Sequence, residues 1–585
     1  MSGLTFWGAS VSAFGSQNQV ARDSAHPVVA VPEDQVKALP PLEENGPAAA
    51  LRQLIECQRR ARNEEARRRW QIVADFYRRR SYALAWSNEG GLLPDAAELL
   101  SAVTQAEQNG LEPKDYVLSA GLELHRVGNG TDEQARAERD VELTQLFVNY
   151  ARDVTRGRVV HPAFYPPKHV DIGALLDGAL AQHGVADAVQ QLGPRHPGYE
   201  RLRTALIEYR RLAQNGGWPA VPPGPKLKRG DSEPRVAALR ARLAATGDFA
   251  GVEAGAARGK RSSRPIAMFD RALEAAVRGF QRRHGLAPDG RVGEATLAAL
   301  NVPVAERIRQ LELNLERWRW LPADLGNRYI VVNLPGYDLR VVERQRDANG
   351  DGETTVMDMR AVVGRTELPT PAMSATITQI VLNPFWNIPA DIAEKEMIPE
   401  LAKDPAYLAK RQIKVLSREK GRRAVDPRKI DWESEGWRFE YRLRQEPGPR
   451  NSLGQLKFVV RNPFGIYLHD TPKRSLFRQL KRAISHGCIR VEHPHELAAY
   501  LLAGTPWSRD TIVTVAASGR RKFIDLPEPV PVHLVYFTAW VDEDGGVQFR
   551  NDVYGDDTEL DAALRTEIGS VPLPACSQTA RQVTP

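Results

Sequence analysis

Two segments of the sequence decide the fold: Ile466-Tyr467-Leu468-His469-Asp470-Thr471 and Ala483-Ile484-Ser485-His486-Gly487-Cys488-Ile489-Arg490-Val491. The first is strand-like from Gly465 to Leu468, so His469 stands at a strand end. A cysteine is nucleophilic as its thiolate, which a base or a positive field must favour. We therefore expect His469 to meet Cys488 from a neighbouring strand and to act as its base.

The residues around Cys488 fit the same chemistry. Gly487 allows a tight turn, in which backbone N–H groups converge near the sulfur and form an oxyanion hole. Arg490 points to the same side as Cys488 if the local chain is extended, and it is then placed to hold a substrate carboxylate. His486 is a second histidine beside the cysteine, and it is either a neighbour or a competing base.

The other cysteines and the known cofactor motifs add no second chemistry. Cys57 and Cys576 lie far from Cys488 with no CxxC spacing, so a disulfide scaffold and an all-cysteine zinc site are excluded. We expect both to be structural. The sequence has no Walker A, GxGxxG, HExxH or zinc-finger spacing, and it predicts no metal and no cofactor.

Length and composition set the class. The chain has 585 residues, which suggests about four domains, and its 42% apolar and 26% charged residues are typical of a globular protein. Collagen-like, wholly disordered and polytopic membrane proteins are excluded, since no run of 18 apolar residues exists. The net charge of +7 is interpreted as mixed surface charge, with binding to an acidic polymer such as nucleic acid or cell wall as the alternative.

Working outward from the motif, residues 328–518 alternate with a period of two and predict a mostly β catalytic domain. A polar, Lys/Arg-rich insertion at 391–455 interrupts this pattern. Residues 519–585 are expected to hold further strands and a frayed tail. The strands predicted inside the domain are Tyr329–Leu334, Asp338–Val342, Met357–Gly364, Ile377–Leu382, Phe458–Val460 and Thr511–Val515.

The N-terminal half follows a helical period. Residues 1–47 are polar and proline-rich and predict a disordered leader or tether, whereas 48–227 predict an all-α domain. Residues 228–302 predict a small three-helix domain. The expected fold class is therefore multidomain α+β, with a lid-like insertion in the catalytic domain.

One acidic loop resembles a metal site. Asp347–Gly352 with Asp358 partly fits a calcium-binding loop, but the twelfth position holds Asp instead of Glu. Because its flanks are strand-like, we expect a hairpin turn, with a calcium site as the alternative.

The motif resembles the L,D-transpeptidase catalytic domain, whose signature is an upstream His followed by [ST]-[HS]-G-C-hydrophobic-[RN]. The resemblance extends over about residues 50–555 and points to the large, multidomain, Gram-negative branch. Phe280–Gly290 with Thr296–Leu300 is similar to a peptidoglycan-binding-like domain. Gly110–Tyr116 and Leu143–Arg158 are similar to a helical scaffold domain. Trp318–Trp320 and Asn383–Pro389 also resemble that branch.

This resemblance implies site roles and a reaction. Cys488 would be acylated by a tetrapeptide stem with loss of D-Ala, His469 would be its base, and Arg490 would orient substrate. His486 and Gly487 would place backbone donors. Resolution of the thioester by an amine would make a 3→3 peptidoglycan cross-link without a metal or cofactor, and carbapenem β-lactams would acylate the same cysteine. The residues we expect to contact the substrate are Ser485, Tyr467 and Trp386.

Two other functions stay open. A cysteine peptidase or amidase of the same family would resolve the thioester with water and could release wall-linked peptides. The third possible function is a non-catalytic wall-binding or scaffold protein. The presence of Cys488, His469 and Arg490 together argues against it. The partners implied are peptidoglycan stem peptides, donor and amine acceptor, and possible other cell-wall synthesis proteins, with no nucleic acid.

Localisation and the insertion complete the expectations. The resemblance implies the periplasm, but residues 1–15 lack Lys and Arg and are a poor secretory signal, so we expect the true start upstream. The insertion is either a solvated decoration or a lid over the donor. We favour the lid, because acyl transfer to an amine must outcompete water and a closed site excludes water.

Overall fold

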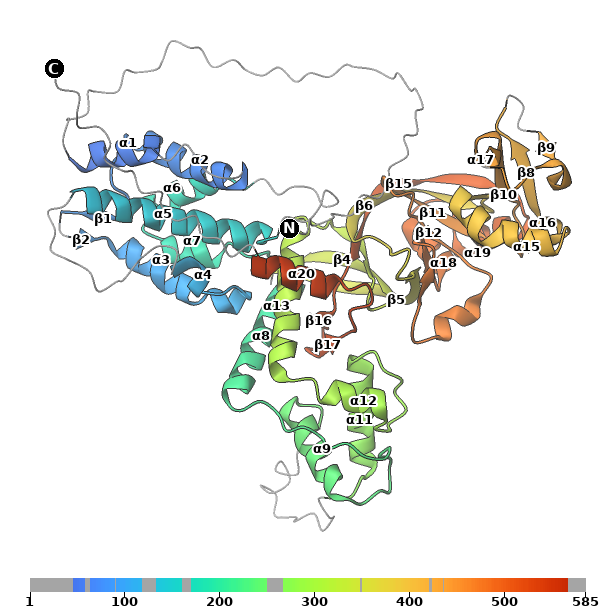
Figure 1. Ribbon diagram of the computed structural model, residues 1–585, viewed down its shortest axis with the longest axis horizontal. Coiled ribbons are helices and arrows are strands. Elements are labelled where there is room, and N and C mark those ends of the chain that lie inside the picture. The colour runs from blue at the N-terminus through green and yellow to red at the C-terminus, as the bar shows by residue number, and fades with distance from the viewer. Residues whose placement is uncertain are drawn as a thin grey trace. The chain divides into compact units, whose positions relative to one another are not determined.

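The computed structural model describes residues 46–57, 64–89, 91–117, 133–159, 170–249, 267–347, 350–419, 423–434 and 436–566 (Figure 1). Most of the expected leader, residues 1–45, and the end of the tail lie outside these ranges. Helical regions precede a large sheet, which confirms the mixed α+β class. Among the described residues, no helix is long and apolar enough to cross a membrane.

In the described parts of residues 46–214, the first helical region holds eight α-helices and one two-stranded ribbon. Its longest helix, α5, buries one apolar face along most of its length. The elements are α1 (Pro47–Cys57), α2 (Glu64–Arg79), β1 (Ser87–Asn88), β2 (Gly91–Leu92), α3 (Pro94–Thr104), α4 (Lys114–Val117), α5 (Glu133–Arg156), α6 (Ile172–Ala181), α7 (Val185–Gln190) and α8 (Pro197–Gln214).

The next unit has the three helices that the sequence predicts, and they share one core. These are α9 (Pro234–Ala245), α11 (Arg271–Arg283) and α12 (Glu294–Leu300). The Asp270 carboxylate caps α11 by accepting the Leu273 N–H, and Phe280 on its inner face is 1% exposed. Leu239, Leu273 and Phe280 pack in the same cluster, so the apolar face of each helix is buried locally.

The large sheet has nine strands in the order β13-β5-β14-β12-β11-β6-β15-β3-β4, and β4 also pairs with β5, so the sheet curls back on itself. One face covers a core that includes Leu468, Ile489 and Phe458. The strands are β3 (Arg328–Asn333), β4 (Asp338–Asp347), β5 (Gly350–Gly364), β6 (Met373–Leu382), β11 (Leu456–Arg461), β12 (Leu468–His469), β13 (Ala483–Ser485), β14 (Ile489–Val491) and β15 (Lys522–Val535).

Three details differ from or extend the sequence-based expectations. Residues Thr511–Val515 are helical, in α19 (Arg509–Ala517), so the strand predicted there is wrong. Strand β15 pairs with both β6 and β3, so the sheet continues beyond residue 518. The acidic loop after Asp347 joins the antiparallel strands β4 and β5, as the hairpin prediction requires.

The α19 helix forms because tertiary packing overrides β-propensity. Ser508 caps it by accepting the Thr511 N–H at 3.2 Å. Ile512 and Ala516, four residues apart, are 0% and 2% exposed, whereas Val513 is 39% exposed. This one-sided burial needs a helical period, and it lets α19 pack against α18 (Pro494–Leu501) and β6.

The insertion folds around its own core. Its strands and the preceding β7 form a separate four-stranded sheet in the order β7-β10-β8-β9, and these elements lie together in Figure 1. Trp432 and Trp437 pack edge to face with ring centroids 5.5 Å apart. The elements are β7 (Trp386–Ile388), α14 (Ala390–Ile392), a π-helical turn (Ala393–Met397), α15 (Ile398–Lys403), α16 (Tyr407–Lys410), β8 (Ile413–Ser417), β9 (Ala424–Val425), α17 (Trp437–Glu440) and β10 (Tyr441–Gln445).

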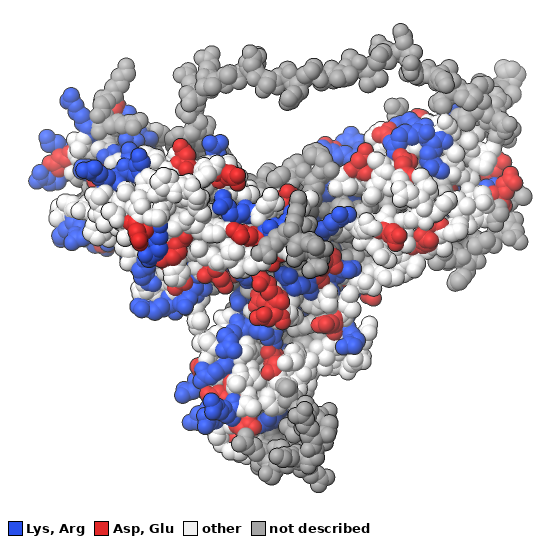
Figure 2. All heavy atoms as spheres, turned by 180° about the vertical axis from the view of Figure 1, so that it is seen from behind, with Lys and Arg blue, Asp and Glu red and all other residues white. Residues whose placement is uncertain are grey.

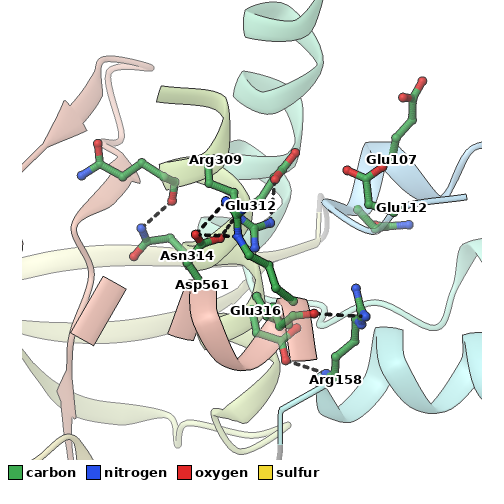
Figure 3. Close-up of polar contacts among 12 residues, drawn as sticks. Glu107, Glu112, Arg158, Arg309, Glu312, Asn314, Glu316 and Asp561 are labelled. Atoms are coloured by element: carbon green, nitrogen blue, oxygen red, sulfur yellow. Dashed lines mark hydrogen bonds and ion pairs between the residues drawn. The ribbon is translucent and has the colours of Figure 1, made fainter. Parts of the chain in front are cut away.

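Helix α13 (Val304–Trp320) carries buried polar side chains that contact the first helical region (Figure 3). Glu316 accepts the backbone N–H groups of Arg158 and Val159 and pairs with Arg319 at 2.8 Å. The side chains of Arg319 and Glu316 are 0% and 2% exposed. Loss of either partner would leave a buried charge, which costs about 3–5 kcal/mol, so this pair constrains how α13 packs.

The same helix also holds the C-terminal segment. The side-chain amide of Asn314 donates to Thr538 Oγ1 at 2.8 Å, and its oxygen accepts the Thr538 backbone N–H at 3.0 Å. Arg309 pairs with Asp561 of α20 (Asp556–Thr566) at 2.5 Å (Figure 3). The short hairpin β16 (Ala539–Val541) and β17 (Val547–Phe549) follows β15 directly, so α13 fixes the segment that emerges from the sheet.

Charge is distributed over the described surface in both signs. Figure 2 shows Lys and Arg interspersed with Asp and Glu on one face. This mixed pattern agrees with surface charge as the main source of the net +7.

Candidate active site

The parallel pairing of β12 and β14 places the two sequence segments side by side. His469 is in register with Arg490, and Leu468 with Ile489. Leu468 and Ile489 face the core, so the alternation of the strands places His469 and Arg490 on the opposite face. The expected meeting of the upstream histidine with the cysteine motif across neighbouring strands is thus what the topology produces.

The turn before β14 is held by buried hydroxyl groups. Ser485 is 1% exposed and its Oγ donates to the Cys488 carbonyl oxygen at 2.6 Å. Thr370 Oγ1 donates to the Gly487 carbonyl oxygen at 2.7 Å. Gly487 has φ +103°, and a Cβ there would lie 3.3 Å from Ile466, so only glycine fits without strain.

The turn leaves backbone donors next to the sulfur. Among the residues that the structure describes, the N–H groups of His486 and Cys488 have no hydrogen-bond partner, whereas Gly487 donates to Ser485 Oγ at 3.2 Å. Free N–H groups beside a nucleophile are the donors that stabilise a developing oxyanion. Cys488 N–H and His486 N–H are therefore the candidate oxyanion donors, rather than Gly487 N–H.

Cys488 lies among cations and one phenol. Its Sγ is 4.0 Å from the Gly465 carbonyl oxygen, and the Tyr467 side chain forms a hydrogen bond with it. Burial raises the pKa of the Cys488 thiol, although Tyr467 and the positive charges of Lys457 and Arg490 act in the opposite direction. At neutral pH the resting cysteine is therefore a thiol.

His469 is buried and neutral. Its pKa is lowered to about 3, because burial disfavours the imidazolium and the charges of Arg490 and Lys457 add to this effect. Nδ1 lies 2.5 Å from the Asp470 carbonyl oxygen. In the neutral ring Nδ1 thus carries the proton that it donates to this oxygen, and the backbone of Leu453 forms a second hydrogen bond with the ring.

The resting pair is therefore a neutral thiol and a neutral imidazole. In the described part of the chain no hydrogen bond joins the Cys488 sulfur to the His469 ring. Such bonds are often long without substrate and tighten in the complex, so the base role of His469 stays a prediction.

Lys457 is a site residue that the sequence did not indicate. It is in register with His469 on β11, and its Nζ lies 3.6 Å from the centre of the Tyr467 ring. Burial lowers the pKa of Lys457, and the sulfur of Cys488 is close enough to oppose this shift. The alternation of apolar and polar residues in β11 would have predicted that Lys457 lies on the polar face of the strand. Only the strand pairing shows that Cys488 lies near the same face.

His486 points away from the sulfur to the insertion. Its Nε2 contacts Glu396 Oε1, and Arg365 pairs with the same oxygen at 3.3 Å. Burial raises the pKa of Glu396, but the contacts with His486 and Arg365 outweigh burial and lower this pKa overall. Glu396 lies in the π-helical turn, a feature often found at functional sites. His486 thus contacts the start of the insertion, whereas the His469 ring bonds to the backbone of Leu453 near its end.

Two of the expected substrate contacts have side chains that are engaged within the protein. The Ser485 hydroxyl is committed to the turn, and Trp386 packs against the core of the insertion. Phe385 and Asn387, the neighbours of Trp386, line a pocket instead. Only Tyr467 of the three borders the sulfur, so the substrate-binding roles of Ser485 and Trp386 stay predictions.

The structure gives no positive indication of a metal centre. Among the described residues, no group of three or more His, Cys, Asp or Glu side chains could hold a metal ion. Cys576 lies outside the described residues, as does the side chain of Cys57.

Sequence families match three parts of the chain. Residues 327–514 match the family described as "L,D-transpeptidase catalytic domain", and 71–206 match "Scaffold domain". Residues 232–300 match "Putative peptidoglycan binding domain". Cys488, His469 and Arg490 thus lie in the segment that is similar to the catalytic-domain family.

A curated relative supports the same family. The "Putative L,D-transpeptidase" of Haemophilus influenzae is 36% identical over 255 residues, which are 44% of this chain and 49% of the relative. The chain thus spans about half the length of the curated relative it matches. By these matches, residues 327–514 are similar to L,D-transpeptidase catalytic domains, and part of the chain is similar to a curated putative L,D-transpeptidase.

Solved structures add nothing to this assignment. Bd1075 of Bdellovibrio bacteriovorus is 15% identical, with a TM-score of 0.15 over 41% of this chain and 56% of its own. A fused zinc-dependent amidase/peptidase and peptidoglycan-binding protein of Clostridium acetobutylicum is 12% identical, with a TM-score of 0.14 over 53% of this chain and 100% of its own. Such scores carry no argument.

The neutral thiol predicts a specific pH profile for alkylation. In a Cys57→Ser/Cys576→Ser background, the rate of Cys488 alkylation by iodoacetamide should rise about tenfold per pH unit from pH 6 and keep rising beyond pH 8.5, because the thiolate is the nucleophile and the pKa is raised. Intact-mass kinetics measure the rate. A plateau below pH 7 would instead indicate a preformed thiolate–imidazolium pair.

Proposed function

We propose that the protein is an L,D-transpeptidase that forms 3→3 peptidoglycan cross-links through a thioester on Cys488. The observation that supports the proposal is the β12–β14 pairing, in which His469 is in register with Arg490, two residues after Cys488. The family match over residues 327–514 supports the reaction class.

In the proposed first half-reaction, His469 is the base and Cys488 is the nucleophile. His469 Nε2 takes the proton from the Cys488 thiol, and the sulfur attacks the carbonyl carbon between the L-centre of the diamino acid and D-Ala. The oxyanion is stabilised by the N–H groups of Cys488 and His486. The C–N bond breaks, the imidazolium protonates the departing amine of D-Ala, and a thioester remains.

The second half-reaction returns the enzyme to its resting state. An acceptor amine attacks the thioester carbonyl and gives its proton to His469. The C–S bond breaks, Cys488 regains a proton from the imidazolium, and a new amide joins donor and acceptor. If water takes the place of the amine, the same intermediate gives hydrolysis, which is the peptidase or amidase alternative.

The accompanying regions fit a protein that works on the cell wall. We propose that residues 48–227 are a scaffold domain, that 228–302 are a wall-binding domain and that 328–518 hold the catalytic domain. Peptidoglycan stem peptides would be donor and acceptor, and the periplasm would be the compartment. The matches to a scaffold domain and to a peptidoglycan-binding domain support this organisation.

Product analysis tests the proposal. With a disaccharide tetrapeptide, the wild-type protein should release D-Ala and give a cross-linked dimer by mass spectrometry. Cys488→Ala should give neither, and His469→Ala should lose about two to four decades in rate, the usual weight of a general base. Cys57→Ser/Cys576→Ser serves as the matched control and should keep wild-type rates. Monomeric tripeptide as the only product, with a good amine acceptor present, would favour the hydrolase.

We further propose that the insertion, residues 391–455, is a lid over the donor. The contact of Glu396 with His486 and Arg365 supports this role, because it joins the start of the insertion to the residue two before Cys488. A closed lid would protect the thioester from water.

Loosening this contact should change the products. Glu396→Gln removes the charge that holds His486 and Arg365, so the fraction of hydrolysed product should rise severalfold while D-Ala release persists. Glu400→Gln is the control, since Glu400 pairs only with Lys403 on the exposed side of α15, at 2.7 Å. An unchanged ratio of cross-linked to hydrolysed product in Glu396→Gln would contradict the lid.

A further inference from the structure

A chain of hydrogen bonds connects the C-terminal segment with the peptide bond between Gly487 and Cys488. This peptide bond is trans, so its N–H and C=O groups point in opposite directions. Thr370, which is 1% exposed, donates its hydroxyl proton to the Gly487 carbonyl oxygen at 2.7 Å. The direction of the Cys488 N–H, a candidate oxyanion donor, is therefore set by the group that holds this carbonyl.

A second contact orients the Thr370 hydroxyl. The Gly364 N–H lies 2.9 Å from Thr370 Oγ1, and an N–H group can only donate. The hydroxyl oxygen is thus the acceptor toward Gly364, and its own proton is left for the Gly487 carbonyl. Hydrogen bonds in such a chain polarise one another, so Thr370 also strengthens the N–H of the same peptide bond as a donor.

Gly364 and Thr370 form the neck of a tight loop between β5 and β6. A Cβ at Gly364 would lie 2.3 Å from the Leu368 carbonyl oxygen and 2.6 Å from the Thr370 nitrogen, so this close approach requires glycine. Tyr554 bridges the neck, because its hydroxyl donates to the Gly364 carbonyl oxygen at 2.7 Å and accepts the Thr370 N–H at 3.4 Å. Burial raises the pKa of Tyr554, so the hydroxyl keeps its proton at neutral pH.

Tyr554 is held in place by its own segment. Its N–H donates to the Tyr536 hydroxyl at 2.7 Å, and this hydroxyl donates to Asp552 Oδ1 at 2.7 Å. The two tyrosine rings lie 5.5 Å apart, and Tyr554 packs against the core of the large sheet. Asp552 also accepts the Asp557 N–H, and Arg317 of α13 pairs with Asp557. The hydrogen bonds that reach the Gly487 carbonyl thus begin at α13.

We propose that Tyr554 is a positioning residue for the oxyanion hole, which holds Thr370 so that the Cys488 N–H is aligned with the developing oxyanion. Tyr554 lies beyond residue 514, where the similarity to the catalytic-domain family ends, so the site includes a residue outside that segment. The inference rests on the proposed function, because the oxyanion is that of acyl transfer to Cys488.

Acylation by p-nitrophenyl acetate tests this role without a peptide substrate. In the Cys57→Ser/Cys576→Ser background, the Cys488 sulfur bonds to the acetyl carbon, the thiol proton passes to His469, the C–O bond breaks and p-nitrophenolate leaves. Tyr554→Phe removes only the hydroxyl and should slow this step about tenfold, less than the roughly 100- to 1000-fold loss of a whole oxyanion donor. Absorbance of the nitrophenolate and intact-mass spectra measure the rate.

Alkylation of the same sulfur separates positioning from general disturbance of the site. Iodoacetamide reacts at a saturated carbon and forms no oxyanion, so its rate and pH profile should be the same in Tyr554→Phe and in the background protein. A shift of Cys488 or His469 would change both reactions. Tyr500→Phe is the matched control, since its hydroxyl bonds to Glu343 on β4, and it should keep both rates.

Thr370 provides the second pair of variants. Thr370→Val replaces the hydroxyl with a methyl group and should slow acylation at least as much as Tyr554→Phe does, whereas Thr370→Ser keeps the hydroxyl and should restore most of the rate. Because Tyr554 acts through Thr370, the double variant Tyr554→Phe/Thr370→Val should lose no more than Thr370→Val alone. Circular dichroism checks that each variant is folded.

The outcomes separate the two claims. An unchanged acylation rate in Tyr554→Phe, equal losses of acylation and alkylation, or additive losses in the double variant would each overturn the positioning role. Wild-type acylation by Thr370→Val would overturn it even if Tyr554→Phe did not fold. The predicted loss of acylation, combined with no D-Ala release from a tetrapeptide by the wild type, would keep the positioning role and reject the transpeptidase.

Discussion

The parallel pairing of β12 with β14 is the constraint on which the site depends. It fixes His469 beside Arg490 and requires the chain to enter β14 through a turn that only glycine at 487 can make. Ser485 and Thr370 satisfy the carbonyl groups of this turn from inside. The turn is thus held by buried groups, which leaves the N–H groups next to the sulfur available for catalysis.

The electrostatics of the site follow from burial. The thiol of Cys488 has a raised pKa and the imidazole of His469 a lowered one, so neither is charged in the resting state at neutral pH. The positive charges of Lys457 and Arg490 lower the pKa of the Cys488 thiol and oppose the effect of burial. In the proposed mechanism, the thiol therefore needs a base before it can act as a nucleophile.

Motif and period predicted the fold class, the three small helices and most strands. They failed at Thr511–Val515, because a run of β-branched residues cannot show that Ile512 and Ala516 are buried on one side. They missed Lys457 and Glu396, which reach the site from β11 and from the insertion. Such partners depend on which strands pair, and a single sequence does not encode that locally.

The most direct test of the central claim is the site of acylation. Wild-type protein incubated with tetrapeptide donor and no amine acceptor, then quenched in acid, should carry one tripeptide acyl group, and peptide mapping should place it on Cys488 with one D-Ala released per adduct. A thioester is cleaved by hydroxylamine, which should remove the adduct. Release of D-Ala with the adduct on another residue, or undiminished release by Cys488→Ala protein, would contradict the account.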